Sequence, residues 1–155
     1  MKKTVLIASL FALLLSSALF YLVSKKEQFD PHKEITLIDG KKFSLATLPE
    51  SKTVVLFWAT TCSTCILEMP ELSKMQAEKP FNIIAVSMYY DDENQVRKYI
   101  ASKQFNFMFV HDNTNVFSES FGNVKFTPTM FVIDKRGIVS QKIVSGTLEE
   151  IKKII

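Results

Sequence analysis

The segment Val54-Val-Leu-Phe-Trp-Ala-Thr-Thr-Cys-Ser-Thr-Cys65 joins a run of apolar and β-branched residues directly to a pair of cysteines. A continuous apolar run of this kind is typical of a buried central strand. The residues that follow the second cysteine, up to Ala77, are compatible with a helix. The segment therefore predicts a strand that leads to the first cysteine, with both sulfur atoms at the start of the next helix.

Cys62 and Cys65 are the only cysteines of the 155-residue chain, and they form one C-x-x-C motif. The first turn of a helix has unpaired N–H groups and the positive end of the helix dipole, so it stabilises a thiolate. We expect the pKa of the Cys62 thiol to fall from about 8.5 into the range of roughly 3.5–7.5 found in such motifs. A reactive thiolate beside a second thiol is suited to disulfide exchange, in which one sulfur attacks and the other resolves the mixed disulfide.

Other roles for the cysteine pair have less support. A structural disulfide that closes so short a loop removes little entropy from the unfolded chain. A structural zinc site normally has four ligands, and besides the two cysteines the chain offers only His32 and His111. A copper chaperone that uses Cys62, Cys65 and His111 stays open, because thiolates and imidazole suit copper. We otherwise expect no metal site and no cofactor.

The N-terminal part of the chain has the pattern of a membrane anchor. An uncharged stretch of twenty residues, Thr4 to Val23, lies between two pairs of lysines. Twenty helical residues span about 30 Å, the thickness of the hydrocarbon core. A signal peptide cleaved near Ser16-Ser17-Ala18 is the alternative, although the apolar run continues beyond that site. We predict a signal-anchor over 1–26, a tether over 27–34, and an exported domain over 35–155 that meets an oxidising compartment.

Charge and composition exclude nucleic-acid binding and favour one folded domain. The net charge is only +3, and the chain has no basic patch or arginine-rich run. Binding to nucleic acid therefore has no electrostatic support. The apolar content of 47% includes 13 phenylalanines, which is enough for a single well-filled core.

Helical and strand patterns alternate along the rest of the chain. Such alternation predicts an α/β domain with a mixed central sheet and helices on both of its faces. The expected elements are a hairpin at 35–44, strands at 53–59, 82–88 and 107–110, helices at 62–77, 92–103, 116–121 and 148–155, and a hairpin at 129–144 with its turn at 134–137.

These motifs together resemble the thioredoxin-fold family of membrane-anchored thiol-disulfide oxidoreductases of the TlpA/ResA/DsbE (CcmG) type. Trp58-Ala-Thr-Thr-Cys-Ser-Thr-Cys65 is similar to the family signature W-x-x-x-C-x-x-C, and Glu68 and Pro70 continue it as C-x-x-C-x-x-E-x-P. Thr127-Pro128-Thr129 resembles the family's cis-proline loop. The resemblance covers about residues 32–155 and implies a thioredoxin fold with an N-terminal β-hairpin and a central insert at 89–113.

The resemblance also implies a proton-transfer group for the cysteine pair. Glu68 lies one helical turn beyond Cys65, and it would take up a proton when Cys65 attacks the mixed disulfide. Thioredoxin itself has a buried aspartate where this chain has Leu56. Glu68 is therefore the one candidate for this step, and we count it with Cys62 and Cys65 as catalytic.

Three further residues are implied to bind substrate. Trp58 is expected to pack beside the sulfur atoms and to shield them from one side. A cis Pro128 would lie opposite the sulfurs and leave the backbone of Thr127 free to pair with an extended substrate segment, a small-scale form of β-augmentation.

The function implied by the resemblance is reduction of disulfides in specific client proteins, such as apocytochrome c or copper-site assembly factors. A membrane electron donor of the DsbD/CcdA kind would supply the electrons. The implied location is the bacterial inner (cytoplasmic) membrane, with a single span and the catalytic domain on the periplasmic side, or the periplasm or medium after cleavage. A disulfide-donating oxidant is the alternative, because only the reduction potential decides the direction.

Overall fold

The structure is a computed structural model, and it describes residues 16, 29–49, 51–145 and 148–155. The elements of these residues follow the predicted order closely. They are β1 (Ile35–Thr36), β2 (Lys42–Phe43), the 3-10 helix η1 (Leu45–Thr47), β3 (Thr53–Trp58), α2 (Ser63–Glu78), β4 (Asn82–Ser87), α3 (Glu93–Ala101), β5 (Met108–His111), α4 (Val116–Ser120), β6 (Thr129–Ile133), β7 (Val139–Val144) and α5 (Leu148–Lys152).

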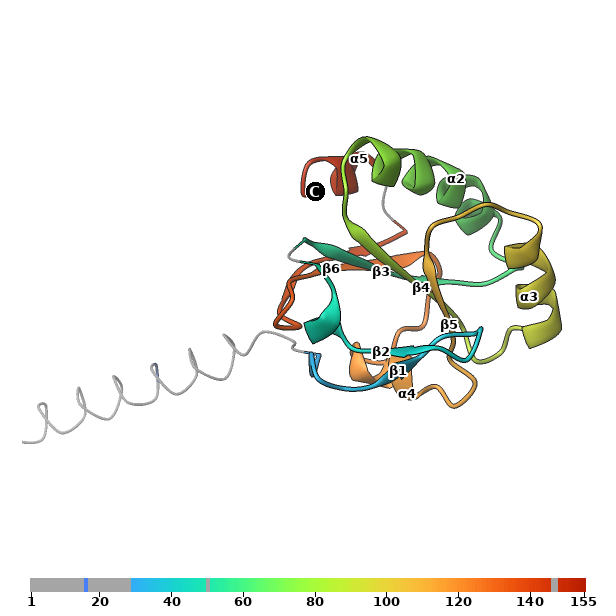
Figure 1. Cartoon of the computed structure of the whole chain (residues 1–155), viewed down its shortest axis with the longest axis horizontal. Coiled ribbons are helices and arrows are strands. Elements are labelled where there is room, and N and C mark those ends of the chain that lie inside the picture. The colour runs from blue at the N-terminus through green and yellow to red at the C-terminus, as the bar shows by residue number, and fades with distance from the viewer. Residues whose placement is uncertain (1–15, 17–28, 50, 146–147) are drawn as a thin grey trace, which may run out of the picture.

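The predicted mixed central sheet is present, and it has five strands in the order β5-β4-β3-β6-β7 (Figure 1). β3, β4 and β5 are parallel to one another, β6 is antiparallel to β3, and β7 is antiparallel to β6. All six residues of β3 are buried, because the strand has neighbours on both edges and is covered on both faces. β1 and β2 pair with each other in a separate small hairpin.

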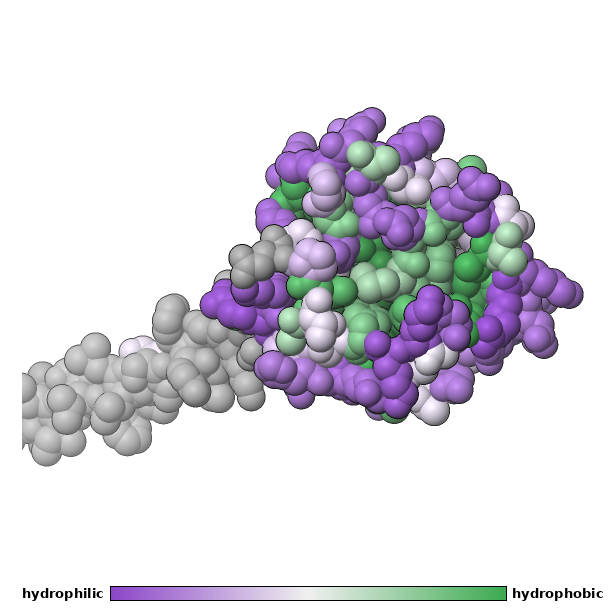
Figure 2. Space-filling view, viewed as in Figure 1, coloured by the Kyte–Doolittle hydropathy of each residue, from purple (hydrophilic) through white to green (hydrophobic). Residues whose placement is uncertain are grey.

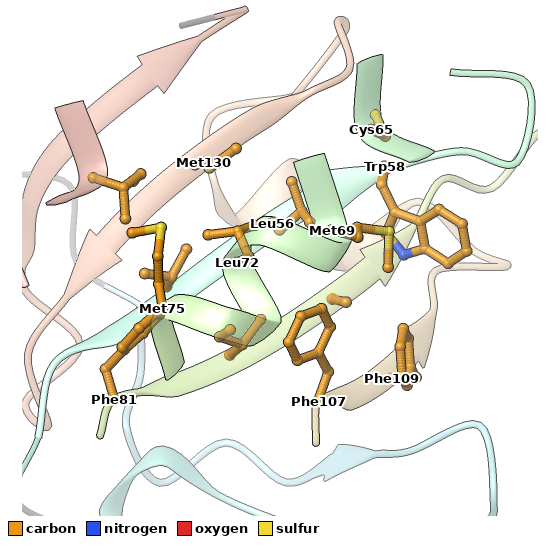
Figure 3. Packing of buried hydrophobic residues seen from close by; sticks show 14 of the residues in the cluster. Leu56, Trp58, Cys65, Met69, Leu72, Met75, Phe81, Phe107, Phe109 and Met130 are labelled. Carbon is orange, nitrogen blue, oxygen red and sulfur yellow. The ribbon is translucent and has the colours of Figure 1, made fainter. Parts of the chain in front are cut away.

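The two faces of the sheet carry two separate apolar clusters. Alternate residues of a strand point to opposite faces, so Leu56 and Trp58 lie in one cluster and Val55 and Phe57 in the other. Residues of α2, α3 and α5 complete the first cluster, which is shown in Figure 3. The hairpin formed by β1 and β2 covers the opposite face together with α4.

The segment 89–113, which the resemblance implies to be an insert, has a defined place in the sheet. It forms α3 and then β5, which pairs parallel with β4 and becomes an edge strand of the sheet. Figure 2 shows that, on the side of the domain that faces the viewer, an area of apolar side chains is surrounded by hydrophilic ones.

Phe29 lies within the predicted tether and is nevertheless buried in the domain. Its ring contacts the rings of Phe117 and Phe121, with centroids 5.3 and 5.1 Å away. Its N–H group donates to the carbonyl of Gly137 at 2.9 Å, in the turn between β6 and β7. Because β6 is antiparallel to β3, this turn lies at the end of the sheet opposite the end where β3 leads to the cysteines.

The predicted signal-anchor at 1–26 lies outside the described residues, apart from Ser16. Among the residues that the structure describes, no helix has the length and apolar character needed to cross a membrane.

Candidate active site at the start of helix α2

Cys62 and Cys65 form a disulfide at the N-terminus of α2, with Cα atoms 5.3 Å apart. Cys62 is the N-cap residue of the helix, and its Sγ accepts a hydrogen bond from the N–H of Cys65 at 3.2 Å. The side chain of Cys65 is fully buried, whereas Cys62 is partly exposed. Cys62 is therefore the sulfur that an incoming thiol or disulfide can reach, and Cys65 is the inner partner.

Glu68 lies on α2, one turn beyond the inner cysteine, and its side chain is half-buried. Its Oε2 atom has no hydrogen-bond partner among the described residues. Burial raises the pKa of the Glu68 carboxyl above its usual value of 4.5, because desolvation disfavours the charged form. A carboxyl group in this state binds a proton more readily than a surface glutamate. Leu56 is fully buried in the central strand, so this strand supplies no alternative carboxylate.

Trp58 packs in the same apolar cluster as Cys65, as Figure 3 shows. It is fully buried, and its ring contacts those of Tyr99 and Phe109 at centroid distances of 5.3 and 6.3 Å. The indole Nε1 has no hydrogen-bond partner within the part of the chain that the structure describes. The packing beside the inner cysteine agrees with the predicted position, whereas substrate contact stays a prediction.

The Thr127–Pro128 peptide bond is cis, as the resemblance implies. Two hydrogen bonds hold the loop around it: Thr129 Oγ1 donates to the carbonyl of Phe126 at 2.7 Å, and the N–H of Ser145 donates to the carbonyl of Pro128 at 2.9 Å. Neither the N–H nor the C=O group of Thr127 is hydrogen bonded to another described residue. Since Thr129 pairs with Phe57, the loop lies at the same end of the sheet as the cysteines.

Asp91 is a site residue that the sequence analysis missed. Its side chain is only 9% exposed, and its carboxylate accepts two hydrogen bonds from Thr60, from the N–H at 2.6 Å and from Oγ1 at 2.5 Å. Thr60 belongs to the turn closed by the Cys62 N–H and the Ala59 carbonyl at 3.0 Å. Asp91 thus fixes the turn that delivers Cys62 to the helix. The only signal in the sequence is an acidic residue a few positions after a buried strand, in the segment Met88-Tyr-Tyr-Asp91.

His111 is placed in a different environment from the one that a copper site needs. Its Nδ1 lies 2.9 Å from Oγ of the buried Ser87. Within the described ranges, no three His, Cys, Asp or Glu side chains gather as a group that could hold a metal ion. The copper-chaperone alternative therefore gains no support from these residues.

Comparison with known families identifies the class of protein to which this arrangement belongs. The family model of redoxins matches residues 27–154, almost the whole of the folded domain. The chain belongs to the Redoxin family.

Relatives place this redoxin among the TlpA/ResA/DsbE-type proteins. It is 30% identical over 157 residues to the thiol-disulfide oxidoreductase ResA of Bacillus cereus, which covers 92% of this chain and 88% of that protein. It is 29% identical over 140 residues to the thioredoxin-like protein YneN of Bacillus subtilis, covering 84% and 81%. The crystal structure of a thioredoxin-family thiol:disulfide interchange protein from Chlorobium tepidum matches with a TM-score of 0.68 and 26% identity, covering 84% of this chain and 97% of that one. The predicted family and the predicted thioredoxin fold of the domain are confirmed, whereas the predicted N-terminal transmembrane helix stays a prediction, and the redoxin is a thiol-disulfide oxidoreductase.

Proposed function

We propose that this redoxin reduces disulfides in client proteins by dithiol exchange at Cys62 and Cys65. The observation that carries the proposal is the arrangement of three groups on α2. A reachable sulfur caps the helix, a buried sulfur lies behind it, and a carboxyl with a raised pKa lies one turn further on. Each group has the environment that one step of disulfide exchange requires.

In the first step the Cys62 thiolate attacks one sulfur of the client disulfide. A bond forms between Cys62 and the client, and the other client sulfur leaves as a thiolate that takes up a proton. The Cys65 thiol then transfers its proton to the Glu68 carboxylate and attacks Sγ of Cys62. This second step forms the Cys62–Cys65 disulfide, breaks the bond between Cys62 and the client, and releases the second client sulfur as a thiolate that takes up a proton from Glu68 or water. Two electrons thereby pass from the protein to the client.

The lysine-flanked apolar stretch at 4–23 supports a location outside the cytoplasm, with the domain anchored to the inner membrane. A reductant in an oxidising compartment needs a continuing source of electrons. We infer a membrane dithiol donor of the DsbD/CcdA kind, and clients such as apocytochrome c or copper-site assembly factors. Both inferences follow from the resemblance to the TlpA/ResA/DsbE type.

A disulfide-donating role is the second candidate, and one observation favours it. The Cys65 N–H already points at Sγ of Cys62, and a hydrogen bond of this kind stabilises a thiolate more than a disulfide sulfur. Stabilising the reduced form makes a dithiol more oxidising. The burial that raises the pKa of Glu68 argues in the other direction, because desolvation near the cysteines disfavours a thiolate as well as a carboxylate.

The equilibrium potential of the Cys62–Cys65 couple tests the proposal, measured on full-length protein in glutathione or dithiothreitol buffers. A potential near or below about −250 mV supports a reductant, and one near about −120 mV overturns that direction in favour of an oxidant. The variant Cys62→Ser provides the control, because it should show no reversible couple. If the unaltered protein shows none either, both redox proposals are wrong.

A further inference from the structure

A groove with a volume of about 410 Å³ lies beside the cis-proline loop. The segment 122–126, which leads into the loop, lines one part of it, and residues of β6 and β7 line another. Thr129, at the start of β6, pairs with both Phe57 and Val144 and so connects the groove to the central strand. Because the loop lies at the cysteine end of the sheet, a segment bound across the loop can extend into the groove.

The groove presents apolar side chains that are exposed although their backbone is fixed. Phe126 is 67% exposed and Val144 is 47% exposed. The carbonyl of Phe126 is held by the buried Thr129, whose Oγ1 donates to it at 2.7 Å. A large side chain held at the surface in this way contributes little to the core. Exposed apolar groups next to a reactive site mark a contact surface.

The charge of the groove is of one sign. Lys125 and Lys142 line it and are both exposed, and none of its lining residues is acidic. The ammonium group of Lys142 lies 5.2 Å from the ring centroid of Phe131, which holds the lysine over the sheet. Two cations without a neighbouring anion in the lining favour an anionic group in a bound segment.

We propose that this groove selects clients with an apolar residue and an acidic residue close to the disulfide that is reduced. The inference rests on the proposed function, since the client must first present its disulfide to Cys62. An extended segment that pairs with the free backbone groups of Thr127 advances by about 3.3 Å per residue. The groove would therefore contact residues of the client that lie near its cysteine in the sequence.

The test uses three synthetic peptides, each with one internal disulfide and a leucine followed by a variable position. The variable residue is glutamate, glutamine or lysine. With full-length protein at low ionic strength, we expect kcat/KM to be about fivefold higher for the glutamate peptide than for the lysine peptide, with glutamine between them. Added salt should reduce the difference, because both lysines are exposed to solvent.

The double variant Lys125→Glu/Lys142→Glu should reverse the order of the three peptides. Lys41→Glu/Lys153→Glu is the matched control, because it makes the same change in net charge at exposed lysines outside the groove. The control should keep the original order. The proposal is overturned if the groove variant leaves the order of the three peptides unchanged. It is also overturned if the control variant reverses this order as well.

The apolar part of the groove is tested separately with Phe126→Ala. This variant should raise KM for the leucine peptide several-fold and leave KM unchanged for a peptide with glycine at that position. Equal effects on both peptides would contradict an apolar subsite. If none of the peptides is reduced by the unaltered protein, the proposed reductase function fails. If all are reduced at rates that ignore charge, only the groove inference fails.

Discussion

The Glu68 carboxyl is the residue whose environment most directly sets a dependence on pH. Burial raises its pKa above 4.5, so the folded protein holds this proton at pH values where the unfolded chain has released it. Stability therefore falls as the pH rises from about 4.5 to the raised pKa, and the full penalty is present above that. Glu68→Gln removes the penalty, and we expect its stability advantage over the unaltered protein to grow across this pH range in urea unfolding experiments.

Glu68→Gln should also slow the resolving attack of Cys65 by about 100-fold, since glutamine cannot accept the proton. Rapid-mixing kinetics of mixed-disulfide decay would measure this step. Glu71→Gln is the control, because Glu71 lies on the same helix but is exposed and paired with Lys74 at 2.6 Å. Equal slowing in both variants would show that Glu68 has no specific role in the proton transfer.

Asp91 acts on the reactive cysteine through Thr60, so we regard it as a positioning residue. Asp91→Asn replaces the charged acceptor of both Thr60 hydrogen bonds with a neutral amide that has a single acceptor oxygen, and we expect a loss of about 1–3 kcal/mol in unfolding free energy. Alkylation of Cys62 in the reduced protein should become slower, with an altered pH profile.

Asp92→Asn is the matched control for Asp91. Asp92 accepts the Gln95 N–H at 2.9 Å as the N-cap of α3, and asparagine caps helices equally well. We expect it to leave both stability and alkylation unchanged. A Cys62 pH profile that is the same in Asp91→Asn as in the unaltered protein would reduce Asp91 to a purely structural role.

At this scale the sequence pointed to the cysteine pair, Glu68 and the cis bond, but it did not predict which residues hold the turn before Cys62 in place. The cysteines, Glu68 and the cis bond before Pro128 belong to motifs of fixed spacing. Asp91 and Thr60 are 31 residues apart, and only the parallel pairing of β3 and β4 brings them together. No local pattern contains that information.

The turn between β6 and β7 is the element that receives the start of the folded chain. Gly137 has φ +73°, and a Cβ atom at this position would lie 1.7 Å from the Phe29 carbonyl oxygen. Gly137→Ala should therefore displace Phe29 and cost about 3–5 kcal/mol, the sum of backbone strain and the loss of a buried phenylalanine. Thermal or urea unfolding, followed by the fluorescence of Trp58, would measure the loss.

Gly40→Ala provides a control for backbone strain alone. Gly40 also has a positive φ, of +87°, but a Cβ atom there would meet nothing within 4 Å. We expect a cost of about 1–2 kcal/mol. Equal losses in the two alanine variants would show that the contact between Gly137 and Phe29 contributes nothing to stability.

Most elements could be predicted because their patterns are local, whereas pairing between distant strands could not. The apolar run before Cys62 became β3, and the helix expected at 62–77 is α2, Ser63–Glu78. The helix expected at 92–103 is shorter, Glu93–Ala101, because helix ends depend on capping by single residues. That β5 would extend the sheet beside β4 depends on packing across the whole domain.

For the whole molecule, redox state and stability are linked through one thermodynamic cycle. If the folded protein is a reductant, folding favours the disulfide, and the oxidised protein must be the more stable form. We expect a higher urea midpoint for the oxidised than for the reduced protein, and a free energy of unfolding that is larger by about 1.4 kcal/mol for each 30 mV by which folding lowers the potential. A reduced protein that is more stable would contradict the reductase and favour the disulfide donor.

The overall architecture was predictable because composition, alternation and motif order agree on one fold. The burial of Phe29 was not predictable, since the surrounding sequence is polar and includes Pro31. The role of a single aromatic residue in such a segment becomes visible only when its ring contacts with Phe117 and Phe121 are known.

The contact between Phe29 and Gly137 has a mechanical consequence. A pull on the preceding residues is borne first by a buried ring and a backbone hydrogen bond, and then passes into β6. β6 is paired along both edges, so the load spreads in shear over β3 and β7. The domain is thus held at one end of its sheet, and the disulfide lies at the opposite end, away from the path of such a load.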